Sequence, residues 1–243
     1  MSEPLNPQAG HRQRLREKFL RDGLAKLTDE EVIELLLTFG TPRRDCKQAA
    51  RTLLKVFGSI RSVFEAEVSE LSRIEGVGRN NIVAIKFIYQ AAGRFLEQRL
   101  IGRDYLSSSK KVFEYLTHHF SNLKKEVFQV IYLDSANGVL ALEDISRGTV
   151  RGAHVHPREV IERALNHQAA GMVFVHNHPS GKTQPSPDDF RMTRHLVHAA
   201  RLVEVNVLDH LIVGRLDRYY SFRDQGHLAR YEQEFNNYYN ARG

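Results

Sequence analysis

The stretch from residue 171 to residue 189 constrains the fold of this chain more than any other. It begins with a short apolar run bounded by glycine, residues 171–175, which is typical of a buried β-strand. The run ends in His-Asn-His at 176–178, and Ser-Pro-Asp-Asp follows at 186–189. Ser before Pro, with acids in the next two positions, is typical of the start of a helix. We therefore expect the end of a buried strand to face the beginning of a helix.

Two imidazoles and one carboxylate in this stretch are candidate metal ligands. His176 and His178 should point to the same side of an extended segment, because side chains alternate along a strand. Asp189, at the helix start, is the third candidate. Three protein ligands leave the fourth tetrahedral position open to water, which distinguishes catalytic zinc sites from closed structural ones. The pattern predicts one Zn²⁺ per chain.

Simpler interpretations of the same residues exist. Ser186 and Asp189 also form the S-x-x-D pattern of a capping box, in which the carboxylate bonds the backbone of the serine and contacts no metal. His-x-His is also found as exposed polar sequence, and the chain contains a second example at His154 and His156. That second pair has no acid at a comparable spacing in a helix start. From sequence alone, Asp189 is either a ligand or a helix cap.

The order and spacing of these residues resemble a known family. The string His176-x-His178-Pro179, followed by Ser186 and Asp189, resembles the motif of JAMM (JAB1/MPN) metalloproteases, and its flanks are similar to the bacterial RadC-like group. Four further segments resemble blocks of that family in the same order: residues 126–134, 147–149, 157–160 and 208–210. The resemblance covers nearly the whole chain. It implies an α/β fold of the MPN type, a mixed sheet flanked by helices, and zinc-dependent cleavage of peptide or isopeptide bonds.

The resemblance also implies two catalytic roles. In JAMM enzymes a Glu at the start of the first core strand acts as general acid and base, and Glu126 occupies that place. Such a group is needed because a zinc-activated water must lose a proton and the leaving amine must gain one. Ser186 corresponds to a hydrogen-bond donor to the oxyanion. Three other carboxylates are alternatives for the role of Glu126, namely Glu143, Asp144 and Glu159. An acid at this edge of a strand can also serve only as a surface ion pair with a neighbouring lysine.

The pattern of elements changes once along the 243 residues, near residues 102–111. Before this point the chain reads as helices at residues 15–20, 28–38, 46–57, 63–71 and 80–100. Afterwards strands are expected at 126–134, 139–145, 172–175 and 204–213, with Asn137-Gly138 as a hairpin turn. We expect a small all-α domain at 1–101, an MPN domain at 105–230 and a C-terminal tail at 231–243.

The helical half carries its own motif, an apolar-x-Gly-x-Gly sequence ending in Gly76, Val77 and Gly78. It resembles the hairpin of a helix-hairpin-helix module, where exposed backbone N–H groups at the next helix start can hold a phosphate. Gly76, Gly78 and Arg79 are therefore candidate DNA contacts, and the net charge of +6 favours polyanionic partners. Asn80 stands where related hairpins often have lysine, so a packing role is the alternative.

Composition and the remaining motifs narrow the function further. The single Cys46 excludes an internal disulfide and thiolate zinc clusters, and no apolar run approaches the length of a membrane span. A cytoplasmic protein without membrane contact is the expectation.

Nucleases more usually build carboxylate-rich sites, so a peptide or protein substrate is favoured over a phosphodiester. The alternative is a DNA-binding or repair-associated protein with a metal site of unproven activity. Asp209-His210 either orients a zinc-ligating ring or caps a strand end.

Overall fold

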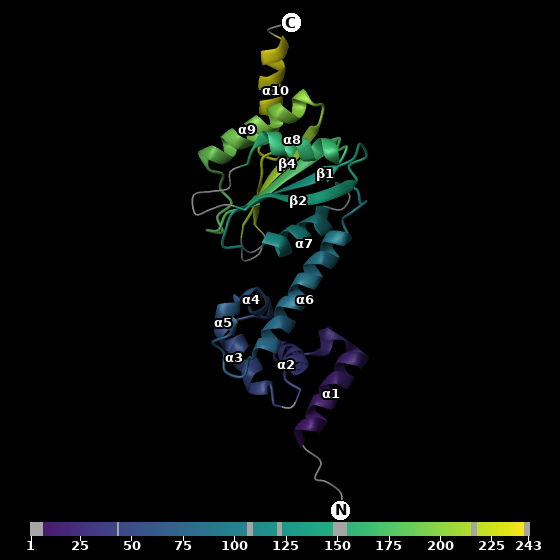
Figure 1. Ribbon diagram of the computed structural model, residues 1–243, viewed down its shortest axis with the longest axis vertical. Helices are drawn as coiled ribbons and strands as arrows, with labels where there is room; N and C mark the ends of the chain where they lie inside the picture. The colour runs from purple at the N-terminus through teal and green to yellow at the C-terminus, as the bar shows by residue number, and fades with distance from the viewer. Residues whose placement is uncertain are drawn as a thin grey trace, which may run out of the picture. The chain divides into compact units, whose positions relative to one another are not determined.

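The computed structural model describes residues 7–42, 44–105, 109–120, 123–147, 155–214 and 218–240 (Figure 1). Two compact units meet between Ala92 and Gly93, within helix α6 (Arg79–Gln98). This division lies before the junction at 101–105 that the sequence predicts. The cause is that Leu96 and Leu100 pack into the core of the second unit. His154 of the second His-x-His pair, and residues 148–149 of one family-like block, lie outside the described residues.

The first unit is helical throughout its described part. Its helices are α1 (Pro7–Asp22), the short 3-10 helix η1 (Leu24–Lys26), α2 (Asp29–Gly40), α3 (Lys47–Phe57), α4 (Ile60–Glu65), α5 (Val68–Leu71) and most of α6. Their apolar faces form one core, with Ile33, Leu53 and Ile85 fully buried. The single helix expected at 63–71 is wrong. Ala66 adopts an extended backbone, and the N–H of Glu67 bonds the Glu70 carboxylate at 2.8 Å, so a new helix begins there.

The second unit is built on a five-stranded mixed sheet in the order β2-β1-β3-β4-β5. The strands are β1 (Val127–Leu133), β2 (Val139–Arg147), β3 (Gly171–Asn177), β4 (Asn206–Val213) and β5 (Tyr219–Ser221). β1 pairs antiparallel with β2 and β3, β3 pairs parallel with β4, and β4 pairs antiparallel with β5. The expected α/β class, a mixed sheet flanked by helices, is confirmed.

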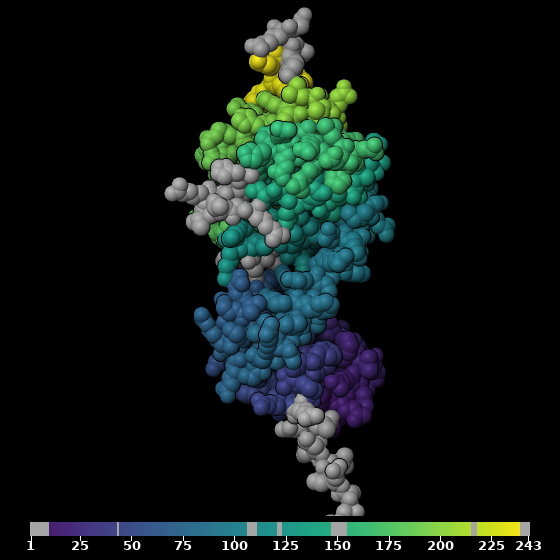
Figure 2. All heavy atoms as spheres, in the orientation of Figure 1, coloured from purple at the N-terminus to yellow at the C-terminus, as the bar shows by residue number. Residues whose placement is uncertain are grey.

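Helices cover both faces of this sheet. α7 (Ser109–Phe120) packs against Val127, Ile131 and Val173, whereas α8 (Pro157–Asn166), α9 (Pro187–Leu202) and α10 (His227–Asn240) pack against Phe128 and Phe174 (Figure 1). The light green atoms of α9 lie toward the upper end of this unit in the view (Figure 2). Every residue of β1 and β3 is buried, which explains why both strands read as continuous apolar runs.

The β1–β2 turn and the C-terminal helix can each be compared with the sequence prediction. The β1–β2 turn at Asn137-Gly138 is confirmed, because Asn137 has a φ of 62° and the Asp134 carboxylate accepts the N–H of Gly138 at 2.7 Å. Residues 231–240, the described part of the expected tail, do not form a separate element. They continue α10, which contacts α9, and the side chain of Tyr231 is buried in the core.

Candidate metal centre

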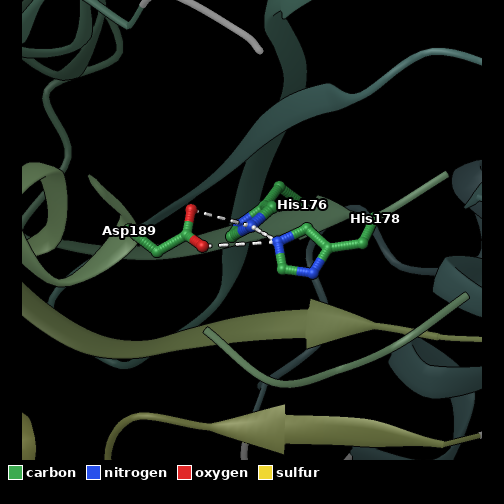
Figure 3. A group of neighbouring side chains, drawn as sticks. All are labelled: His176, His178 and Asp189. Carbon is green, nitrogen blue, oxygen red and sulfur yellow. Dashed lines mark hydrogen bonds and ion pairs between the residues drawn. The ribbon is translucent and has the colours of Figure 1, made fainter. Parts of the chain in front are cut away.

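The three candidate ligands come together between the end of β3 and the start of α9 (Figure 3). His176 is fully buried near the end of the strand, His178 lies in the following loop, and Asp189 is buried in the first turn of the helix. The Nε2 atoms of the two histidines are 3.0 Å apart. The carboxylate of Asp189 lies 3.2 Å from Nε2 of His176 and 3.3 Å from Nε2 of His178. One candidate ligand atom from each residue lies within 4.8 Å of the others.

Asp189 caps the helix and belongs to the cluster at the same time. The backbone N–H and the hydroxyl of Ser186 both donate to Oδ2 of Asp189 at 2.7 Å, and the N–H of Asp189 donates back to the hydroxyl oxygen at 3.2 Å. Oδ1 is turned toward His176. The two interpretations of Asp189 are therefore compatible, since capping leaves one oxygen free for the cluster. The single hydroxyl hydrogen of Ser186 is donated to Asp189 in this arrangement.

The donor set fits a cation. Nδ1 of His178 lies 3.0 Å from the carbonyl oxygen of Lys182, which can only accept, so Nδ1 carries a hydrogen. In the neutral ring Nε2 then carries a lone pair, and it faces the nitrogen of His176 and the oxygens of Asp189. Converging lone pairs in a buried site are unfavourable unless a proton or a metal ion lies among them. Two imidazole nitrogens and a carboxylate are ligands that Zn²⁺ accepts.

In the metal-free protein, His178 and Asp189 shift each other's pKa. The hydrogen bond with Asp189 raises the pKa of His178 despite the opposing effect of burial. Burial alone would raise the pKa of Asp189, but its interactions with His176, His178 and Ser186 outweigh burial and keep this pKa well below its ordinary value. In the metal-free cluster each charge therefore favours the other, the carboxylate a proton on His178 and the histidine ring an ionised Asp189.

The pairing of β1 with β3 places Glu126 beside the cluster. Phe128 is the partner of His176, and the N–H of Val127 donates to the side-chain oxygen of Asn177 at 2.9 Å. Continuing this register brings Glu126 opposite His178. Residues opposite one another on antiparallel strands share a face, and so do alternate residues of one strand. Glu126 therefore lies on the face of the two histidines, and its charge contributes to the raised pKa of His178.

Asn177, the residue between the two histidines, holds the backbone on both sides of Glu126. Its side-chain amide donates to the carbonyl of Lys125 at 3.2 Å, and its oxygen accepts the N–H of Val127 at 2.9 Å. The amide is buried. The sequence pattern gives Asn177 no role beyond its place between the two histidines. The one available signal was a polar residue where the pattern predicts a buried strand end.

The rival carboxylates are engaged elsewhere. Glu143 and Glu159 both form ion pairs with Arg163 of α8, at 2.9 and 2.6 Å. Asp144 accepts a hydrogen bond from Gln129 at 3.0 Å on the side of the sheet that α7 covers. None of these interactions involves the His-His-Asp cluster, whereas the charge of Glu126 acts on His178.

Asp209 and His210 are neighbours in the chain, but they contact different partners. Nε2 of His210 lies 2.8 Å from Nδ1 of His176, so this buried ring contacts a candidate ligand directly. Asp209 instead accepts the hydroxyl of Ser221 at 2.7 Å and the backbone N–H of Arg223 at 3.0 Å, which fixes the turn after β5. Burial lowers the pKa of His210 well below its ordinary value.

The glycine hairpin of the first unit lies between α5 and α6. Gly76 has a φ of 83°, α6 begins at Arg79, and Gly76, Gly78 and Arg79 are exposed. Asn81 ties this hairpin to α2, because its buried amide donates to the carbonyl of Leu37 at 2.7 Å while its oxygen accepts the N–H of Gly78 at 3.0 Å. Asn81 therefore packs the hairpin against α2, while the glycine-rich rim of the hairpin lies at the surface.

Comparison with known proteins agrees with this division of the chain. Residues 106–227 match the RadC-like JAB domain, and residues 8–83 match the UPF0758 N-terminal domain. The chain belongs to the RadC-like family. A UPF0758 protein of Cellvibrio japonicus is 40% identical over 202 residues, covering 83% of this chain and 90% of that protein. A UPF0758 protein of Ruegeria pomeroyi is 39% identical over 218 residues, covering 90% and 97%. The RadC-like domain contains all three residues of the cluster.

The helices were also compared with the requirements of a membrane span. Among the helices that the structure describes, none combines the length and the apolar character that spanning a bilayer requires.

In the metal-free protein, His178 should contribute more to stability near about pH 6 than near about pH 8.5. The folded-state pKa of His178 is raised, so its stabilising charge is fully present below its unfolded pKa of 6.5 and is lost as pH rises through the folded value. Thermal unfolding of chelator-treated protein at several pH values measures this. Subtracting the pH profile of the His178→Gln variant from that of the parent gives the contribution of His178. Identical pH profiles for parent and variant would contradict the assignment.

Proposed function

We propose that this chain is a zinc-dependent hydrolase of the JAMM type that cleaves a peptide or isopeptide bond. The observation that carries the proposal is the convergence of His176, His178 and Asp189, with Nδ1 of His178 donating to a carbonyl so that Nε2 is turned to the cluster. Three protein ligands leave a tetrahedral position for water, as hydrolytic zinc sites require. The RadC-like JAB domain supports a hydrolase of this class.

Each residue then has a defined task. His176, His178 and Asp189 would hold the ion, which when bound lowers the pKa of a water molecule and polarises the substrate carbonyl. Glu126 would accept a proton from the attacking water and deliver it to the leaving amine, so that the C–N bond breaks as a C–O bond forms. Ser186 keeps Asp189 oriented, and rotation of its hydroxyl would turn the same hydrogen toward the oxyanion.

Zinc content tests the ligand set. The purified parent should hold about one zinc per chain, and His176→Ala or His178→Ala should lower the content at least about tenfold, because each removes one of three protein ligands. Elemental analysis after dialysis measures it. His156→Ala is the matched control, since this exposed histidine of the second His-x-His pair lies outside the cluster. Full retention of zinc in both cluster variants would reject the assignment.

Glu126→Gln separates chemistry from metal binding. Glutamine keeps the size of the side chain but cannot take up a proton, so zinc should stay near one per chain while hydrolysis falls by roughly 100-fold or more. Cleavage of a mixed peptide and isopeptide library, followed by mass spectrometry, gives the activity. Glu159→Gln, which removes only an ion pair with Arg163, is the control and should keep activity.

Zinc loss in Glu126→Gln would make this residue a ligand, and undiminished activity would exclude it as the base. A zinc-loaded parent that cleaves nothing in the library would favour a metal site that serves stability.

A second candidate function, DNA contact, concerns the first unit. Gly76, Gly78 and Arg79 are exposed at the start of α6, where backbone N–H groups and a guanidinium can meet a phosphate. The formal net charge of +6 favours such a partner. This candidate is independent of the metal centre, because all three residues belong to the other compact unit.

If this surface binds DNA, the full chain should bind duplex DNA weakly at low salt, with affinity falling steeply as salt rises. Arg79→Gln should weaken binding and reduce the salt slope by about one, since one phosphate contact is lost. Fluorescence anisotropy with a labelled duplex measures both quantities. Arg230→Gln in α10 removes the same charge in the second unit and should leave the slope unchanged. Equal slopes for parent and Arg79→Gln would leave the hairpin as a packing element.

A further inference from the structure

His210 is a buried polar residue that the three-ligand set does not use. It comes from β4, and its ring lies among the rings of Phe128, Phe174 and Phe222 at centroid distances of 5.6, 5.9 and 4.7 Å. Such surroundings disfavour a charged imidazolium. Both ring nitrogens nevertheless have polar neighbours, Nδ1 at 2.6 Å from the hydroxyl of Thr193 and Nε2 at 2.8 Å from Nδ1 of His176.

The hydrogen atoms of this network can be assigned from Thr193. Its hydroxyl donates to the backbone carbonyl of Asp189 at 2.6 Å. A hydroxyl has one hydrogen, so toward His210 the oxygen of Thr193 can only accept. Nδ1 of His210 therefore carries the hydrogen and donates to Thr193. In the neutral ring Nε2 of His210 is then the acceptor.

The position of the hydrogen on His176 follows from that on His210. Since Nε2 of His210 accepts, Nδ1 of His176 must carry the hydrogen of their 2.8 Å contact. The neutral His176 ring then has its lone pair on Nε2, the atom turned toward His178 and Asp189. The hydrogen-bonded chain thus starts at one member of the cluster and ends on the backbone of another.

We infer that His210 and Thr193 are positioning residues, which hold His176 in the tautomer whose Nε2 can bind a metal ion. This inference rests on the proposed metal-binding function. It gives the buried polar network a role, because metal-binding histidines usually donate their second N–H to a fixed partner, and loss of that partner typically weakens metal affinity 10- to 100-fold. The network also joins β3, β4 and α9, the three elements that meet at the cluster.

The competing explanation is that His210 only fills space. Its ring stacks on Phe222 with an interplanar angle of 15°, as an aromatic core residue would. On that view a phenylalanine at 210 should serve as well, and the hydroxyl of Thr193 should matter only for the stability of α9. The two explanations therefore differ in metal affinity and in the position of the hydrogen on His176.

Thr193→Val is the central test, because it keeps the shape of the side chain and removes the hydroxyl, which is the acceptor for His210 and the donor to the carbonyl of Asp189. Without that acceptor, His210 should carry its hydrogen on Nε2 and donate to His176, which would move the hydrogen of His176 onto Nε2. We expect zinc affinity, measured by competition with a chelator in the full chain, to fall about 10- to 100-fold. His210→Phe should produce a loss of similar size.

Two control variants separate this effect from a loss of stability. Thr193→Ser keeps the hydroxyl and should retain zinc affinity close to that of the parent. Thr38→Val makes the same substitution at another buried helical threonine, whose hydroxyl donates to the carbonyl of Leu35 at 2.7 Å in the first unit. It should lower thermal stability without changing zinc affinity. Unchanged zinc affinity in both Thr193→Val and His210→Phe would overturn the inference.

A spectroscopic readout makes the inference testable apart from the metal. Long-range ¹H–¹⁵N correlation of the zinc-free protein shows which ring nitrogen of each histidine carries a hydrogen. The parent should show the hydrogen on Nδ1 for both His176 and His210, and Thr193→Val should show it on Nε2. A parent with the hydrogen of His210 on Nε2 would overturn the relay. If the parent binds no zinc but shows the expected tautomers, the proposed function fails while the hydrogen-bonded relay stands.

Discussion

The antiparallel pairing of β1 with β3 is the constraint on which the candidate site depends. Phe128 pairs with His176, and this one register brings Glu126 to the level of His178 and stacks the ring of Phe128 on His176, 6.2 Å between centroids. A shift by one residue would turn Glu126 to the side of α7, because successive side chains of a strand point to opposite faces. The register is fixed by apolar side chains on both faces and by two hydrogen bonds of the Asn177 side chain, which donates to the carbonyl of Lys125 and accepts the N–H of Val127. Core packing and site geometry therefore cannot vary independently.

Much of the site could be predicted because its signals are local. The apolar run before His176 and the Ser-Pro-Asp-Asp helix start lie within one short stretch, and each follows from rules that act over a few residues. The contacts of Asn177 and His210 could not be predicted in this way. They join residues 50 and 34 positions apart in the chain, so they exist only once β1, β3 and β4 are aligned. An amide or imidazole at a buried strand position signals that a partner exists, but not which one.

Two boundaries differ from the sequence prediction, each for its own reason. Periodicity over residues 63–71 indicates one helix, because the apolar positions of α4 and α5 continue in phase. The break at Ala66 follows from competition by Glu67, whose N–H finds the Glu70 carboxylate and starts a second helix. The domain junction was placed by composition at residues 101–105, whereas packing of Leu96 and Leu100 assigns the end of α6 to the second core. Local pattern locates elements well, and tertiary contacts decide where one unit ends.

The cluster itself shows how folding and ligand binding are coupled here. Burial opposes the negative charge of Asp189, and the two imidazoles and Ser186 outweigh that opposition. In the metal-free protein the carboxylate in turn raises the pKa of His178 and so favours a proton on that ring. A metal ion at the same point would replace that proton as the positive charge among the three residues, so proton and metal compete for one position. The network through His210 and Thr193 leaves His176 without a hydrogen on Nε2 in either state. Exchange of proton for metal therefore needs a change at His178 alone, the least buried member of the cluster.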